Sequence, residues 1–180
     1  MRRMMESQFG EGPGGRREGE ISGVRSTAAL FSHPLHPFFV LFPVAFLVSA
    51  LASDAAFIVT DDAFWARASQ WLVGAGLVTG AIAAVFGLTD FLTIRRARNF
   101  AGWVHFLGNA TVLGLALANW LIRLDDRADA VAPVGVGLSS AIVAILLVTG
   151  WLGGELAYRH KVGVIPGERW VEPEIRRRAA

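Results

Sequence analysis

The chain contains four long segments without a charged residue, separated by short polar stretches. These segments are 17, 22, 17 and 25 residues long and cover residues 37–53, 68–89, 106–122 and 130–154. About 20 apolar residues in a helix cross the roughly 30 Å hydrocarbon core of a bilayer, and a helix satisfies its own backbone hydrogen bonds there. We therefore predict membrane-spanning helices over residues 37–59, 70–94, 101–123 and 133–158.

The short connections between these helices make sequential helices antiparallel neighbours. The predicted fold is therefore all-α: an integral membrane four-helix bundle with up-down-up-down topology, covering residues 31–162. Residues 1–30 are rich in glycine and charge and have no hydrophobic period, so we expect a disordered cytoplasmic tail there. Residues 163–180 are expected to form a cytoplasmic C-terminal tail. Pro43 lies inside the first span and should kink it.

Small residues recur at four-residue spacing within three of the spans, which lets helix backbones approach closely. The second span contains Gly76, Gly80 and Ala84, the third contains Ala110, Gly114 and Ala118, and the fourth contains Gly150 and Gly154. We expect these residues at contacts between the helices of the bundle.

The composition supports a membrane protein and excludes several kinds of site. Of the 180 residues, 53% are hydrophobic and 18% are charged, against about 25% charged in an ordinary soluble domain. The absence of cysteine excludes thiolate metal ligands and cysteine nucleophiles. The sequence also contains no P-loop, nucleophile elbow, His-Glu-x-x-His motif or acyl-transfer triad, which argues against an enzyme.

The distribution of basic residues predicts the orientation of the bundle. Fourteen of the 17 basic residues lie in the N-terminal tail, the second loop or the C-terminal tail, and the other three are Arg67, Arg123 and Arg127. Cytoplasmic loops carry the excess of Lys and Arg, so we expect a multi-pass protein of the inner (cytoplasmic) membrane with both termini in the cytoplasm. Because the basic residues do not line one folded face, a nucleic-acid partner is not expected. The expected partners are the lipid bilayer and either subunits of a redox complex or a second copy of the chain.

Ionisable residues inside a span are costly and mark candidate functional sites. In this chain most of them lie at the ends of spans that the topology places on the cytoplasmic side. They are His33 and His36 at the start of the first span, Asp90 at the end of the second, His105 near the start of the third, Glu155 at the end of the fourth, and His160 just beyond it. We expect these residues to share one layer.

Four interpretations of this layer stay open on the sequence alone. Two facing histidines could ligate haem b, with the candidates His36, His105, His33 and His160. A divalent metal could instead be bound by Asp90, Glu155 and His105. Titratable groups could form a proton path in a small transporter. In a structural or accessory subunit without a cofactor, the same groups would only cap helix ends. The first hypothesis is a redox-associated membrane subunit that binds haem or a metal.

Two further patterns concern how the spans meet. One face of the first span and one face of the third carry a stripe of polar or small residues, which begins at His36 and at His105. Asp54 and Arg123 both lie near the outer ends of these stripes, which predicts an interhelical charge pair. A short repeat relates the two hairpins, because Val78-Thr79-Gly80 recurs as Val148-Thr149-Gly150. Each hairpin begins near a histidine and ends near a carboxylate.

Several of these residues also carry a family resemblance, over about residues 30–165. The motifs are His33-Pro34-Leu35-His36-Pro37-Phe38-Phe39-Val40, Phe42-Pro43, Asp90-Phe91-Leu92, His105, Asn109 and the run from Gly150 to His160. This pattern resembles the bacterial membrane family called domain of unknown function 2231. The resemblance implies a four-helix inner-membrane protein, sometimes found in redox contexts, without an agreed activity. The typical family opening has a histidine shortly before the first-span proline, where this chain has Leu41 and Phe42. A ligand role in this chain therefore falls to His36.

Overall fold

The computed structural model describes residues 23–124 and 128–164, and its architecture is an antiparallel four-helix bundle. The first span consists of α1 (Leu35–Phe39) and α2 (Leu41–Thr60), and the second is α3 (Ala63–Thr93). The short turn η1 (Arg95–Arg98) leads into α4 (Phe100–Ile122). The fourth span consists of η2 (Val131–Gly135), α5 (Val136–Gly154) and η3 (Glu155–Arg159). All four spans are long and apolar enough to cross a membrane, as predicted.

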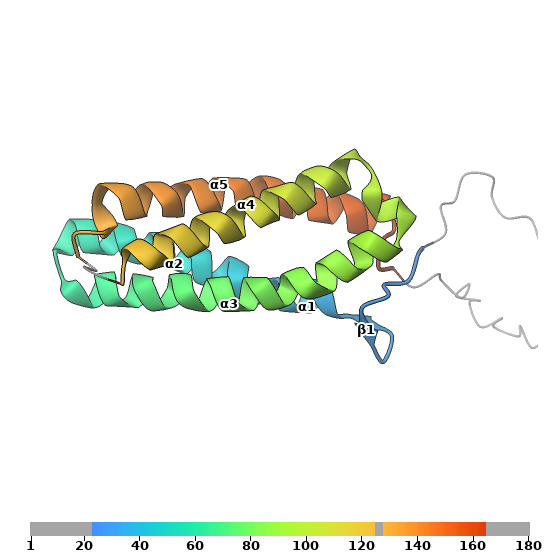
Figure 1. Ribbon diagram of the computed structural model, residues 1–180, viewed down its shortest axis with the longest axis horizontal. Coiled ribbons are helices and arrows are strands. Elements are labelled where there is room, and N and C mark those ends of the chain that lie inside the picture. Colours follow the sequence, from blue (N-terminus) through green and yellow to red (C-terminus); the bar gives the residue numbers. More distant parts are fainter. Residues whose placement is uncertain (1–22, 125–127, 165–180) are drawn as a thin grey trace, which may run out of the picture.

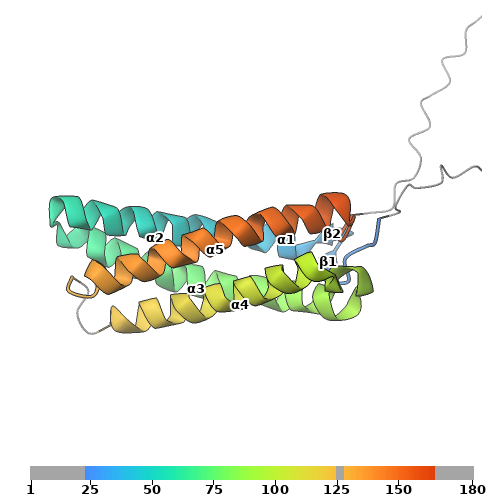
Figure 2. The same ribbon diagram turned by 90° about the horizontal axis from the view of Figure 1, so that it is seen from above.

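The helices pack as two hairpins that face each other (Figures 1 and 2). One hairpin is α2 with α3, and the other is α4 with α5. Contacts of α3 with α4 and of α2 with α5 close the bundle. A buried apolar layer of Leu47, Val112, Ala116 and Ile142 fills its centre, with one or two residues from each of three helices. This arrangement confirms the predicted all-α bundle.

Helix α3 begins at Ala63, seven residues before the predicted start of the second span. Asp62 explains the early start, because its carboxylate accepts a hydrogen bond from the Phe64 amide at 2.8 Å and caps the helix. The prediction missed these residues because Arg67 interrupts the uncharged segment. Since Arg67 is exposed, its charge does not have to be buried by the helix.

The first span is interrupted at Val40, between α1 and α2, three residues before Pro43. Proline has no amide hydrogen, so Pro43 cannot bond to the carbonyl of Phe39 one turn earlier. Val40 itself keeps helical backbone angles, with φ −64° and ψ −20°, and the kink predicted at Pro43 stays a prediction.

The outside of the bundle is apolar, as expected for a surface that faces lipid. Trp71 and Leu147 are 77% and 72% exposed, and many other large apolar side chains are also exposed. In water such a surface would be an aggregation hazard, whereas in a bilayer it contacts acyl chains.

The small residues of the spans do not all lie at helix contacts. Gly76 is buried, and a methyl group built on it would lie 2.7 Å from the side chain of Leu47. Gly80 has a similar contact with Leu113. In contrast, Ala110, Gly114 and Ala118 are exposed on α4, and Gly150 is exposed on α5. The expectation that these four residues lie between helices of the bundle is therefore wrong; at the depth of the membrane they face outward.

The described chain ends meet at one end of the bundle, which we call the terminal end. There the Val24 amide donates to the Lys161 carbonyl at 2.9 Å, and the Gly163 amide donates to the Val24 carbonyl at 2.8 Å. Residues 24–34, which we call the N-terminal strap, include the small hairpin of β1 (Ala29–Leu30) and β2 (His33–Pro34). The predicted tails fall outside the described residues over 1–22 and 165–180, but residues 24–30 lie against the bundle.

Candidate functional site

His36 enters the bundle from α1 and bonds to the backbone of α3. Its Nδ1 atom lies 2.9 Å from the carbonyl oxygen of Ala83. Gly87, one turn further along α3, leaves the space that the ring needs. A methyl group built on Gly87 would lie 2.7 Å from Cε1 and Nδ1 of the imidazole. The half-buried ring is therefore held in one orientation by a carbonyl and a glycine of the neighbouring helix.

His105 has the same arrangement in the other hairpin. It projects from α4, and its Nδ1 atom lies 2.8 Å from the carbonyl oxygen of Thr149 on α5. Gly153, again one turn further along, faces the ring, and a methyl group built there would lie 3.2 Å from Cε1. The two hairpins thus repeat a unit of histidine, carbonyl and glycine. This unit does not follow the Val-Thr-Gly repeat of the sequence, because the first acceptor is Ala83 and not Thr79.

The two imidazoles are neighbours between the hairpins and meet edge to face. Their ring centres are 6.1 Å apart and their planes meet at 82°. Because a carbonyl oxygen can only accept a hydrogen bond, Nδ1 carries a hydrogen in both rings. In a neutral imidazole of this tautomer Nε2 keeps a lone pair, so each hairpin offers one potential ligand nitrogen. The sequence predicts that His105 lies within hydrogen-bonding or shared-ligand reach of at least one of His36, Asp90 and Glu155; the structure places its ring beside that of His36, and a shared ligand stays a prediction.

Asn109 supports the backbone around His105. Its side-chain amide donates to the His105 carbonyl at 2.7 Å, and its Oδ1 atom accepts a long hydrogen bond of 3.4 Å from Thr149. Thr149 thus contributes its carbonyl to the imidazole and its hydroxyl to Asn109. Both polar side chains lie on the face of their helix that turns toward the partner helix, as the polar stripe of the third span predicts.

Asp90 does not join the histidine pair, because the N-terminal strap occupies its carboxylate. Ser26 donates its hydroxyl to Asp90 at 2.6 Å, and the amides of Thr27 and Ala28 donate at 2.8 and 3.0 Å. The hydroxyl of Thr27 adds a fourth bond at 2.9 Å. Asp90 therefore fixes the strap to the end of α3. Sequence reasoning missed this role because the strap has no hydrophobic period that would predict ordered structure.

The remaining candidate residues lie apart from the pair. Glu155 forms an ion pair with Arg159, one turn later, at 3.1 Å. The exposed His33 bonds through Nδ1 to the Phe31 carbonyl within the strap. The backbone of His160 accepts a long hydrogen bond from Arg96 at 3.5 Å. Within the described ranges, no three His, Cys, Asp or Glu side chains are placed to share a metal ion. The structure thus brings His36 and His105 together and does not bring Asp90 or Glu155 to them.

The opposite end of the bundle contains a second buried polar group, which confirms the predicted charge pair. Arg123 and Asp54 are both fully buried and form an ion pair at 2.8 Å. Two guanidinium nitrogens of Arg123 contact the two carboxylate oxygens of Asp54, so the pair is bidentate. Four neutral polar residues complete this cluster: Ser69, Ser139, Gln70 and Asn119. The polar stripe of the third span included Asn119, whereas sequence reasoning did not single out the other three.

Comparison with known proteins identifies a family and nothing more specific. The model of the predicted membrane protein family DUF2231 matches residues 32–166, which is more than half of the chain. The match includes both histidines of the pair. No curated protein and no solved structure matches the chain.

Proposed function

The chain belongs to the predicted membrane protein family DUF2231, and we propose that it holds a b-type haem between His36 and His105 as a redox-associated membrane subunit. The observation that carries this proposal is the neighbouring pair of imidazoles, each fixed through Nδ1 by a helix carbonyl. Histidines that bind metals usually donate their other ring N–H to such a partner, which fixes the tautomer and the ring orientation.

The set of available ligands favours haem over a bare metal ion. The rings of His36 and His105 are neighbours, with centres 6.1 Å apart, and would offer two nitrogen ligands. A tetrahedral metal site needs further protein ligands, and the described residues offer no group of three His, Cys, Asp or Glu side chains. A porphyrin brings the four other nitrogens itself.

The residues of this chain would do three things at such a site. His36 and His105 would hold the group with one imidazole nitrogen from each hairpin. Ala83 and Thr149 would orient both imidazoles and fix a hydrogen on Nδ1 through their carbonyls. The apolar layer of Leu47, Val112, Ala116 and Ile142 would separate the site from the opposite end of the bundle. When bound, haem supplies a one-electron iron couple whose potential its surroundings set.

An absorbance spectrum of the purified protein tests the proposal. In detergent, the protein produced with sufficient haem is expected to show a haem spectrum that shifts on reduction with dithionite. His36→Ala and His105→Ala should each remove most of this signal, because each deletes one axial nitrogen. His33→Ala and His160→Ala are matched controls outside the pair and should keep it.

Two outcomes would contradict the haem proposal. A folded protein without a haem spectrum would favour the structural subunit, in which the two imidazoles only tie α1 to α3 and α4 to α5. In that case His105→Ala should cost about 1–2 kcal/mol of stability, for one lost hydrogen bond and the carbonyl left behind. Equal loss of haem from the His33→Ala control would place the cofactor elsewhere.

The apolar layer also bears on the proton-path alternative. It consists of Leu47, Val112, Ala116 and Ile142, each at most 3% exposed. The layer lies between the histidine pair and the buried Asp54–Arg123 cluster. A relay along the bundle axis needs hydrogen-bonding groups at every step, and these side chains have none. The arrangement therefore supports an electron-transfer or structural role more than proton transport.

We further propose that both termini lie in the cytoplasm and that the bundle resides in the inner membrane. The support is the distribution of Lys and Arg, since 14 of 17 lie in the two tails and the second loop. Reporter domains fused after residue 127 and after residue 165 should report opposite sides of the membrane, with the second in the cytoplasm. The same side for both fusions would contradict the four-span topology, and a fusion after residue 165 that reports the outer side would contradict this orientation.

A further inference from the structure

The N-terminal strap carries an apolar tip that projects from the terminal end of the bundle. In Figure 1 the hairpin that starts with β1 stands out beside α1 and α3. At its turn Phe31 is 88% exposed and Leu30 is 56% exposed. Phe31 and Ser32 both have positive φ angles, of 48° and 66°. This conformation costs a residue with a side chain about 1 kcal/mol or more, and surrounding structure must maintain it.

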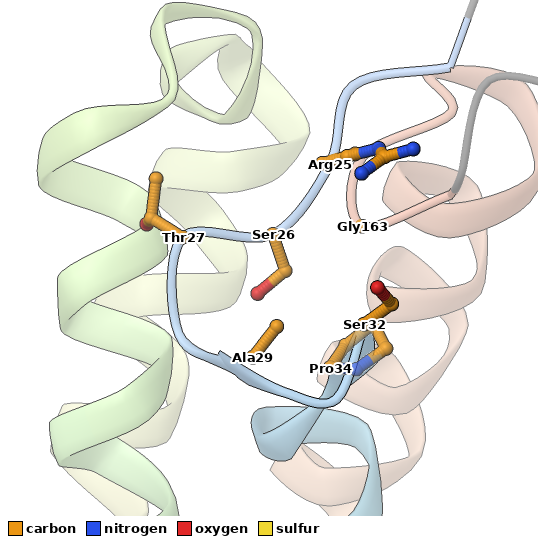
Figure 3. A pocket seen from close by; sticks show the side chains of 7 residues that line it. All are labelled: Arg25, Ser26, Thr27, Ala29, Ser32, Pro34 and Gly163. Carbon is orange, nitrogen blue, oxygen red and sulfur yellow. The ribbon is translucent and has the colours of Figure 1, made fainter.

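A cavity of about 240 Å³ lies behind this tip, between the strap and the end of the chain (Figure 3). Its lining includes Arg25, Ser26, Ser32 and Gly163. The hydroxyl of Ser26 is committed to Asp90. The side chains of Arg25 and Ser32 have no hydrogen-bond or ion-pair partner among residues 23–124 and 128–164. A guanidinium and a hydroxyl at the cavity are thus available to an external acceptor.

The charge around the cavity is strongly positive. Five exposed cationic side chains lie at the terminal end: Arg25, Arg95, Arg98, Arg159 and Lys161. Among residues 23–124 and 128–164 the acidic side chains at this end are Asp90, which accepts four hydrogen bonds from the strap, and Glu155, which is paired with Arg159. In this part of the chain an anion that enters beside Arg25 therefore meets more cationic than anionic side chains.

We propose that this cavity binds the phosphate of an anionic phospholipid, with Arg25 and Ser32 as its donors. Phe31 and Leu30 would then rest at the boundary between headgroups and acyl chains, where an aromatic side chain is favoured. Basic pockets at the ends of transmembrane helices are suited to such headgroups. The apolar tip beside the cavity selects a lipid over free inorganic phosphate, because a free anion would leave that tip in water. This site is independent of the histidine pair.

The site can be tested by measuring the melting temperature of the full chain in neutral detergent with different lipids added. Phosphatidylglycerol should raise the melting temperature at concentrations where phosphatidylcholine does not, because a ligand that binds only the folded state stabilises it. Arg25→Gln should weaken phosphatidylglycerol binding about tenfold, since it removes a charge-assisted donor. Ser32→Ala should weaken it by a smaller factor. Arg67→Gln, an exposed arginine on α3 near the other end of the bundle, is the matched control and should bind as the parent does.

Inorganic phosphate and a tip variant complete the experiment. Phosphate alone should not reproduce the stabilisation, and Phe31→Ser should lower the affinity for phosphatidylglycerol. Equal stabilisation by phosphatidylcholine would overturn the proposal, as would equal stabilisation by phosphate. Unchanged binding by Arg25→Gln would also overturn it, because that exposed residue has no partner in the described fold and its replacement leaves the bundle intact.

Discussion

Arg123→Met is expected to lower the free energy of unfolding by about 3–5 kcal/mol, because removing one partner of a buried ion pair leaves an uncompensated charge. Asp54 is fully buried, and Arg123 meets both of its carboxylate oxygens at 2.8 and 2.9 Å. Arg123 also donates from Nε to Asn119 at 2.9 Å. The variant would therefore break bonds between α2 and α4 and leave the carboxylate with hydroxyl donors alone.

Reversible unfolding in mixed micelles measures this loss. The double variant Asp54→Leu/Arg123→Met should recover a large part of the stability, because it removes both charges together. A double-mutant cycle on the pair should accordingly show strong coupling. The matched control is Arg67→Met, which changes an exposed arginine and should stay within about 0.5 kcal/mol of the parent. A loss at Arg123 no larger than at Arg67 would contradict the assigned role.

The sequence predicted this charge pair because burial of a lone charge in a membrane is so costly. The first and third spans run in the same direction, so Asp54 and Arg123, each near the end of its span, lie at the same depth and had few other partners. Ser69, Ser139 and Gln70 were harder to predict. A neutral hydroxyl or amide in a span can return its hydrogen bond to its own helix, as Thr79 does with Ala75. Their presence in a span therefore does not demand a partner.

The sequence predicted the depth of the histidines and carboxylates in the membrane better than it predicted which of these side chains meet. The rise per residue placed His36, His105, Asp90 and Glu155 near one end of the bundle. Which of them meet depends on rotation of the helices and on segments without a periodic pattern. The N-terminal strap is such a segment, and it takes the carboxylate of Asp90. His36 is another case, since its bond to the Ala83 carbonyl depends on how α1 is rotated relative to α3.

Gly87→Ala is expected to abolish most haem binding while changing stability little. The added methyl group would lie 2.7 Å from Cε1 and Nδ1 of His36, so the ring has to move. The displaced atoms belong to the end of a side chain, which can rotate away at small cost. The rotation breaks the bond to the Ala83 carbonyl and moves the ring away from its place beside His105. Alanine in a helix interior also regains up to about 1 kcal/mol relative to glycine, which offsets the lost bond.

Two further glycine variants test whether the loss of haem comes from contact with a histidine ring. The haem absorbance per protein and the melting temperature are measured for each variant. Gly153→Ala places its methyl group 3.2 Å from His105, a milder contact, and should remove less haem than Gly87→Ala. Gly150→Ala lies on the same helix with nothing within 4 Å of the new methyl group, and should keep all of the haem. If the pair were only structural, all three variants would differ in stability alone. A Gly87→Ala protein with full haem occupancy would show that His36 is not an axial ligand, since the ligand ring cannot keep its place beside the added methyl group.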